Sequence, residues 1–317
     1  KLPSTALSAG QPSARRLRAS WWPAPAPRLG MGWVTTAAKY SDFQRLLQRP
    51  RGTLYTIPFS HYCELARWSL DAARIRYDEV KSLPGFHMVA GASVPGPRRS
   101  GSRCATPTLV VGEDDMVIRD SHEIAKFCAK NYAQALYPMA LRSDIDDDLL
   151  HFHDALGPST RRFAYYHLFQ HFDGRDAAQL GAANGVPAWQ TMAVRVPGVY
   201  AAGRLAIKRG LGVNRARAAR AEGHILGELD AVARRRKGKF LHGDRITLAD
   251  MSFASLMLPA LGVPPELMPP GVALPPPDAL GEHFARQSER FRDHDAGRFA
   301  LEVLSYRPRG LDRDSPW

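Results

Sequence analysis

One stretch constrains the fold more than any other, residues 53–70 with the sequence TLYTIPFSHYCELARWSL. It opens mainly with β-branched and aromatic residues, which favour a buried strand. Pro58 cannot donate a hydrogen bond to a sheet, so the strand should end there. Ser60 is a good helix N-cap, and the apolar Leu65 and Trp68 follow it at helical spacing. The stretch therefore predicts a strand, a tight turn and a helix.

The first turn of this helix would carry the hydroxyl of Ser60 and the thiol of Cys63. Free backbone N–H groups and the positive end of the helix dipole face this end of a helix. Such an end stabilises an anion, and a thiolate is an anion. A hydroxyl that donates to the sulfur favours the thiolate further. Two plainer roles stay open, with Ser60 as a helix cap and Cys63 as a small buried residue.

Three short motifs follow one another along the chain: SHYC at 60–63, ATPTL at 105–109 with Asp-Ser at 120–121, and ITLAD at 246–250. The first occupies the place of the Cys-x-x-Cys of glutaredoxins and thioredoxins, with Ser in the first Cys position. The second resembles a glutathione-binding turn with its acidic-Ser pair, and the third resembles the capping segment of a helical domain. Over residues 52–306 the chain thus resembles the soluble glutathione transferases of the serine/cysteine type.

The resemblance implies a fold, a thioredoxin-like α/β domain followed by an all-α helical domain. It places a thioredoxin-like glutathione-binding domain at residues 52–131, a linker at 132–142 and a helical substrate domain at 143–310. Residues 1–45 are rich in Ala, Ser, Pro and Arg, and no acidic residue occurs before Asp42. This composition predicts either a disordered tail or an organelle transit peptide.

The resemblance also implies an activity, the addition of glutathione thiolate to an electrophilic small molecule, with glutathione as co-substrate. It assigns Ser60 to orient and stabilise that thiolate. The backbone of Thr106, before a cis Pro107, would pair with the cysteinyl part of glutathione. Asp120 and Ser121 would hold its γ-glutamyl end, although an Asp-Ser pair is also a common helix cap.

Two other functions fit the same sequence. Cys63 could be the catalytic residue in place of Ser60, in a glutathione-dependent thiol reductase. Alternatively, the fold could serve as a non-catalytic binding or scaffold module, because a fold does not fix a function. Glutathione affinity separates the transferase from the scaffold, and activity after Cys63→Ala separates it from the reductase.

The composition narrows the class of protein. A chain of 317 residues with 44% hydrophobic residues can form two domains. The net charge of +12 comes without a nucleic-acid-binding motif, so we expect no nucleic-acid partner. Three widely spaced cysteines, Cys63, Cys104 and Cys128, argue for a reducing compartment.

Several expectations about partners and location follow. No apolar run is long enough to cross a bilayer, so we expect no membrane span. We expect a small electrophilic or hydrophobic substrate, and a homodimer is compatible with the family. The protein should be cytoplasmic, or located in an organelle such as the chloroplast or mitochondrion if residues 1–45 are a transit peptide.

Further elements are predicted in the first half of the chain. A second strand is expected at 76–80, whereas the Gly, Pro, Ser and Arg residues at 82–103 predict mostly loop. Apolar runs at 108–111 and 116–119, joined by GEDD, predict a β-hairpin. Residues 120–121 should then cap a helix.

The second half is predicted to be helical. Thr247 and Asp250 form a capping box at the start of a buried helix. Residues 261–277 are too rich in proline to be helical throughout. We expect helices at 144–172 with a break at 157–158, at 199–233, at 278–291 and at 298–305, and an irregular insertion at 174–197.

Histidines in the helical half could suggest a metal site. His167 and His171 are four residues apart, a spacing that places both on one helix face. His151 and His153 lie upstream, but no third ligand is spaced convincingly, and no general base follows in a His-Glu-x-x-His pattern. The sequence therefore predicts no metal site.

The resemblance also indicates where a second substrate would bind. It places Arg161, Arg162, Tyr165 and Tyr166 on the helix that lines the acceptor pocket, although a packed aromatic face is equally compatible. His61 puts a titratable group beside the thiol site.

Overall fold

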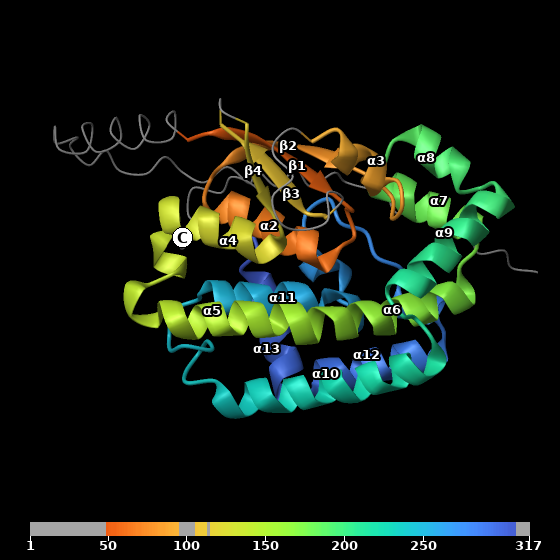
Figure 1. The fold of residues 1–317 in the computed structure, drawn as a ribbon. Helices are drawn as coiled ribbons and strands as arrows, with labels where there is room; N and C mark the ends of the chain where they lie inside the picture. Colours follow the sequence, from red (N-terminus) through yellow and green to blue (C-terminus); the bar gives the residue numbers. More distant parts are fainter. Residues whose placement is uncertain (1–48, 95–104, 113–114, 309–317) are drawn as a thin grey trace, which may run out of the picture. The chain divides into compact units, whose positions relative to one another are not determined.

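The computed structural model describes residues 49–94, 105–112 and 115–308, which belong to a unit spanning residues 48–317. The tail predicted at 1–45 lies outside the described residues, as does Cys104. Figure 1 shows a small sheet with helices α2 and α4 against it, and the other long helices on the far side of these two.

The sheet has four strands, in the order β2-β1-β3-β4. β1 (Arg51–Thr56) runs parallel to β2 (Arg76–Lys81) and antiparallel to β3 (Thr108–Val111). β3 forms the predicted hairpin with β4 (Met116–Arg119). Alternate residues of β1 are buried, as expected for a strand with one face on a core.

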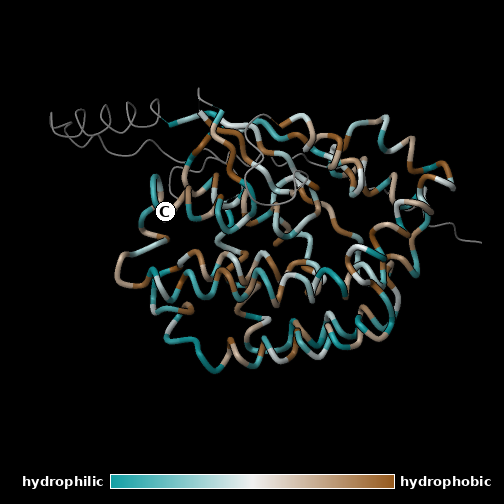
Figure 2. Tube along the Cα trace, in the orientation of Figure 1, coloured by the Kyte–Doolittle hydropathy of each residue, from teal (hydrophilic) through white to brown (hydrophobic). Residues whose placement is uncertain are grey.

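Two helices cover the buried face of the sheet, α2 (His61–Ala72) and α4 (Ser121–Asn131). Both predicted positions are confirmed. Their apolar faces meet those of the strands in one hydrophobic cluster. Figure 2 shows hydrophobic and hydrophilic residues interspersed along the chain, as expected when each element has one face on a core. The cluster contains Leu54, Ala66, Leu70, Leu109, Val111, Ile124 and Cys128.

The segment predicted as loop at 82–103 is helical in part. α3 (His87–Ala92) forms a short helix, because Met and Ala favour a helix despite Gly91. The linker region at 132–142 contains two short 3₁₀ turns, η1 (Gln134–Leu136) and η2 (Met139–Leu141).

The break predicted at 157–158 is absent. α5 (Arg142–His151) continues through a π-helical turn, η3 (Phe152–Leu156), directly into α6 (Gly157–His171). Pro158 lacks an N–H group, and it sits in the first turn of α6, where the widened π turn has already shifted the hydrogen-bond register. The proline is therefore accommodated without interrupting the continuous helix formed by α5, η3 and α6.

The prediction of an irregular insertion at 174–197 is wrong. It forms α7 (Gly174–Ala183) and α8 (Ala188–Ala193). The Asp173 carboxylate accepts hydrogen bonds from the backbone N–H groups of residues 175 and 176, at 2.6 and 3.1 Å. This N-cap starts α7 despite the nearby glycines.

The remaining helices agree with the prediction except at their ends. They are α9 (Pro197–Gly210), α10 (Arg215–Arg235), α12 (Glu282–Asp293) and α13 (Asp295–Ser305). The proline-rich segment 261–277 contains one 3₁₀ turn, η4 (Pro265–Leu267), and is followed by a second, η5 (Pro277–Leu280). None of the helices within the described ranges is long and apolar enough to cross a membrane.

α11 (Leu248–Leu261) lies at the centre of the helical part, and nearly all its residues are buried. A helix that is apolar all round belongs in a core. The predicted capping box is confirmed, because Asp250 accepts from the Thr247 backbone N–H at 2.7 Å. Its other oxygen accepts from the Leu241 N–H at 2.8 Å, which ties the preceding loop to the helix.

Charged residues form a buried network behind α2. Glu64, with 1% of its surface exposed, accepts from Arg67 at 3.0 Å and from Arg307 at 2.7 Å. Arg307 also pairs with Asp71 at 2.7 Å, and Arg67 pairs with Glu79 at 2.7 Å. The end of the described chain is thereby fastened to the helix that carries Ser60.

Candidate functional site

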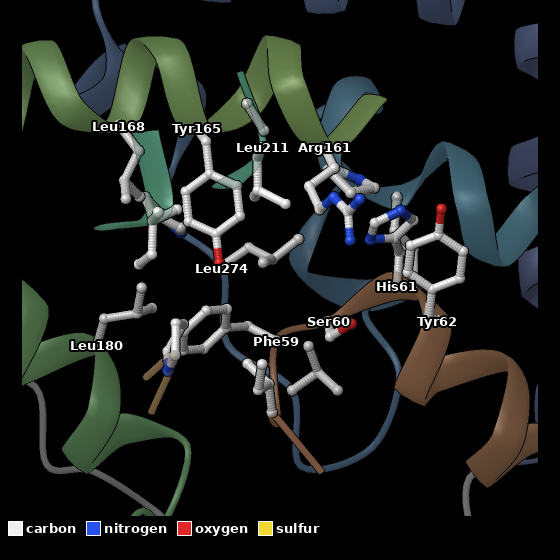
Figure 3. A pocket seen from close by; sticks show the side chains of 18 of the residues that line it. Phe59, Ser60, His61, Tyr62, Arg161, Tyr165, Leu168, Leu180, Leu211 and Leu274 are labelled. Atoms are coloured by element: carbon white, nitrogen blue, oxygen red, sulfur yellow. The ribbon is translucent and has the colours of Figure 1, made fainter. Parts of the chain in front are cut away.

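A cavity of about 1170 Å³ opens beside the first turn of α2. Ser60, Thr106 and Asp120 line it from the sheet side, and α6 and α9 line it from the helical side. Figure 3 shows Ser60 facing Arg161 across this space. A concave, mostly apolar site with a few polar groups is typical of small-molecule binding.

Ser60 occupies the predicted N-cap position of α2, with extended backbone angles. Its side chain makes no capping hydrogen bond to α2 within the described structure, so the hydroxyl is not consumed by the helix start. Burial raises the pKa of the Cys63 thiol, and a hydrogen bond with the Ser60 side chain is among the weaker effects that oppose this rise. Ser60 lines the cavity and lies at the N-terminus of α2, the positive end of the helix dipole.

Cys63 is fully buried, with 0% of its surface exposed. Burial raises the pKa of its thiol to about 11, and the opposing effects of Arg67 and the hydrogen bonds do not compensate. A thiol of this kind is almost entirely protonated at neutral pH and is inert as a nucleophile.

His61 connects α2 to the helical part. Its Nε2 lies 3.1 Å from the carbonyl oxygen of Gly157, and this nitrogen must carry the proton because a carbonyl only accepts. Burial, followed by the charge of Arg161, lowers the pKa of His61 to about 3. The imidazole is therefore neutral, with Nδ1 as its acceptor nitrogen.

The peptide bond between Thr106 and Pro107 is cis, as the resemblance implied. Thr106 lines the cavity, on the same side as Ser60. Pro107 accepts through its carbonyl from the backbone N–H of Asp120 at 3.1 Å. The two predicted cofactor-binding segments are thus joined by a backbone hydrogen bond.

Asp120 and Ser121 start α4, and the Asp120 Oδ1 accepts from the Ser121 N–H at 2.6 Å. Asp120 has a φ of 79°, a left-handed conformation that costs free energy in a residue other than glycine. His122 and His153 place ring nitrogens 3.3 and 2.9 Å from the same oxygen. Their hydrogen bonds lower the pKa of Asp120 despite its burial, so it is an anion.

The opposite wall of the cavity comes from α6. Arg161 and Tyr165 line it, whereas Arg162 and Tyr166 are not among the described lining residues. Figure 3 shows the Tyr165 hydroxyl pointing into the cavity toward Phe59. Burial raises the pKa of Tyr165 to about 12, so the phenol keeps its proton and can donate.

The proline-rich segment 261–277 closes another side of the cavity, which includes Leu274. Asn184, at the C-cap of α7, holds this segment. Its side-chain nitrogen donates to the Ala273 carbonyl at 2.9 Å, and its oxygen accepts from the Ala273 N–H at 2.9 Å. The role of this segment was not predictable from the sequence.

The histidines of the helical half have separate surroundings. His167 stacks on His283, with ring centroids 5.4 Å apart. His151 pairs with Glu228 at 2.9 Å, whereas His153 faces Asp120. His122 did not figure in the sequence reasoning, and its position directly after the Asp-Ser pair was the available signal.

The comparisons with known proteins agree with this arrangement. Residues 54–135 match the family described as the glutathione S-transferase, N-terminal domain. This part of the chain is similar to the N-terminal domain of the glutathione S-transferases. No curated protein is significantly similar to it over its length.

Solved glutathione transferases share the fold of this chain. One from Ceriporiopsis subvermispora, in complex with glutathione, is 14% identical with a TM-score of 0.51, covering 80% of this chain and 96% of that one. One from Phanerochaete chrysosporium is 17% identical with a TM-score of 0.50, covering 81% and 98%. The glutathione transferase architecture predicted from the sequence is confirmed, while the serine/cysteine subtype stays a prediction.

Proposed function

We propose that this glutathione transferase homologue binds glutathione and adds its thiolate to an apolar electrophile. The observation that carries the proposal is the position of Ser60, whose hydroxyl lies at the N-terminus of α2 and lines the large cavity without capping the helix within the described structure. A hydroxyl and a helix dipole at this place favour a bound thiolate over the thiol.

The binding residues are assigned along one side of the cavity. The backbone of Thr106 would pair with the cysteinyl part of glutathione, next to the cis Pro107. Ser121, at the start of α4, would receive the γ-glutamyl carboxylate through a helix N-terminus. The anionic Asp120 would attract the γ-glutamyl ammonium group.

The acceptor would occupy the apolar part of the cavity. Phe59, Tyr165 and Leu168 offer an aromatic and aliphatic surface, as Figure 3 shows. Arg161 supplies a positive charge on the same wall, which suits an electrophile that gains negative charge when the thiolate attacks. The volume of about 1170 Å³ leaves room for both glutathione and a second molecule.

The burial of Cys63 favours the transferase over the reductase, because a reductase needs an accessible thiolate. The homodimer stays a prediction. The cellular location also stays a prediction, since residues 1–45 lie outside the described part of the chain.

The proposal is tested by kinetics on two variants with a chloroaromatic acceptor. Ser60→Ala should lower kcat/KM by about ten- to a thousand-fold, the scale of losing one hydrogen bond to a stabilised anion. Cys63→Ala is the matched control one turn away and should keep the parent rate. If Ser60→Ala conjugates like the parent while Cys63→Ala is inactive, the reductase assignment replaces this one.

A further inference from the structure

Two histidines from distant parts of the chain converge on one oxygen of Asp120. His153 Nε2 lies 2.9 Å from Asp120 Oδ1, and His122 Nδ1 lies 3.3 Å from it. One ligand atom from each of the three residues lies within 4.8 Å of the other two. Ligands about 2.0–2.1 Å from a tetrahedral Zn²⁺ are about 3.3 Å apart, so the cluster has the scale of a metal site.

A carboxylate faces the remote nitrogen of each ring. His153 Nδ1 lies 2.8 Å from Asp154 Oδ1, and His122 Nε2 lies 3.3 Å from Glu123 Oε1. Metal-binding histidines usually donate their other N–H to such a group, which fixes the tautomer and the ring orientation. Both imidazoles are therefore oriented with one nitrogen toward Asp120.

The cluster is also held in place by the fold. His153 lies in the π-helical turn η3, a type of irregularity that is frequent at functional sites. Its carbonyl accepts from the Tyr62 hydroxyl at 3.0 Å, and its ring packs against that of His122, with centroids 4.7 Å apart. The positions of the nitrogens are thus set by packing rather than by free surface side chains.

We propose that Asp120, His122 and His153 bind a divalent transition metal ion, with Zn²⁺ as the best fit. Two imidazoles and one carboxylate suit Zn²⁺, whereas Mg²⁺ and Ca²⁺ prefer oxygen ligands. Three protein ligands leave a further coordination position. Asp120 and His153 line the large cavity, which gives the ion a path of entry.

The test is a titration of the untagged full chain with ZnCl₂ by calorimetry, in the absence of glutathione. The parent should bind one equivalent. His122→Gln and His153→Gln should each weaken binding by more than the 10–100-fold expected for Asp154→Asn, which removes only the orienting carboxylate. His151→Gln is the matched control, because His151 lies two residues away and pairs with Glu228 instead.

Titration with Co²⁺ identifies the ligand type. The visible spectrum should show nitrogen and oxygen ligation, without the charge-transfer band that thiolate ligands produce. A thiolate band, or unchanged Zn²⁺ affinity in folded His122→Gln and His153→Gln proteins, would overturn the proposal. Circular dichroism verifies the fold of each variant, and Asp154→Asn changes only an exposed side chain. Because glutathione is omitted, failure here leaves the proposed transferase activity untouched, and the reverse also holds.

Discussion

The His61 imidazole lies 3.1 Å from the carbonyl of Gly157 through Nε2, and this contact joins the first turn of α2 to the start of α6. Both partners are buried. The neighbouring Tyr62 favours glycine at 157, because a Cβ there would meet the ring and hydroxyl of Tyr62. The helix that carries Ser60 is thus held directly against α6, which lines the opposite wall of the cavity.

This contact should make folding sensitive to acid. The pKa of His61 is lowered to about 3 by burial, by Arg161 and by His153, while an unfolded histidine titrates near 6.5. The unfolded chain therefore binds a proton that the folded chain excludes, so the stability from this group is present above pH 6.5 and is lost as the pH falls. Urea midpoints from pH 7 to 4.5, with chelator present, should fall less steeply for His61→Phe than for the parent. Parallel slopes would contradict this.

Cys63 should resist alkylation in the folded protein. A pKa of about 11, against about 9 for an ordinary thiol, lowers the thiolate fraction at pH 8 by about 100-fold. Iodoacetamide labelling, followed for the peptide that contains Cys63 by mass spectrometry, should be at least about 100-fold slower in native buffer than in guanidinium. Equal rates in the two conditions would mean that the thiol is accessible.

Arg307 should contribute strongly to stability. Arg307→Ala removes a partner from the buried Glu64 and from Asp71, and breaking a buried pair costs about 3–5 kcal/mol. Arg51→Ala is the control, because Arg51 and Asp78 form a pair whose side chains are 74% and 66% exposed. That pair should contribute less than about 1 kcal/mol. Urea unfolding gives the free energy of unfolding of both variants. Similar decreases in the two variants would argue against a stabilising buried network.

Asn184 should control the acceptor side of the cavity. Asn184→Ala removes both hydrogen bonds to Ala273, each worth about 1 kcal/mol, and releases the proline-rich segment. Given the proposed activity, we expect the KM of the acceptor to rise by about 5–30-fold while that of glutathione changes little.

The matched control for this variant is Asn131→Ala, since the Asn131 side chain only donates to the carbonyl of Phe127 at the exposed end of α4. Steady-state kinetics with each substrate varied in turn distinguishes the two variants. If Asn184→Ala raises both KM values equally, the asparagine supports the whole fold rather than one wall.

Local sequence signals predicted much of the fold. The strand and helix around Ser60, the hairpin and the Thr247–Asp250 capping box were all placed from their own residues. Each depends on interactions within a few residues, such as a cap, a proline or an apolar period. The helices at 174–193 were missed, because the glycines and prolines of this segment favoured an irregular structure and the N-cap at Asp173 was not considered.

The sequence by itself determined the thioredoxin-like strand, turn and helix, and it placed Ser60 at a helix N-terminus. Only the tertiary structure decided that Cys63 is buried, that His153 faces Asp120 and that Arg307 pairs with Glu64, 243 residues away. The physical reason is that burial and pairing depend on how distant segments pack, and no local propensity encodes that. The same packing brings the proline-rich segment over the cavity.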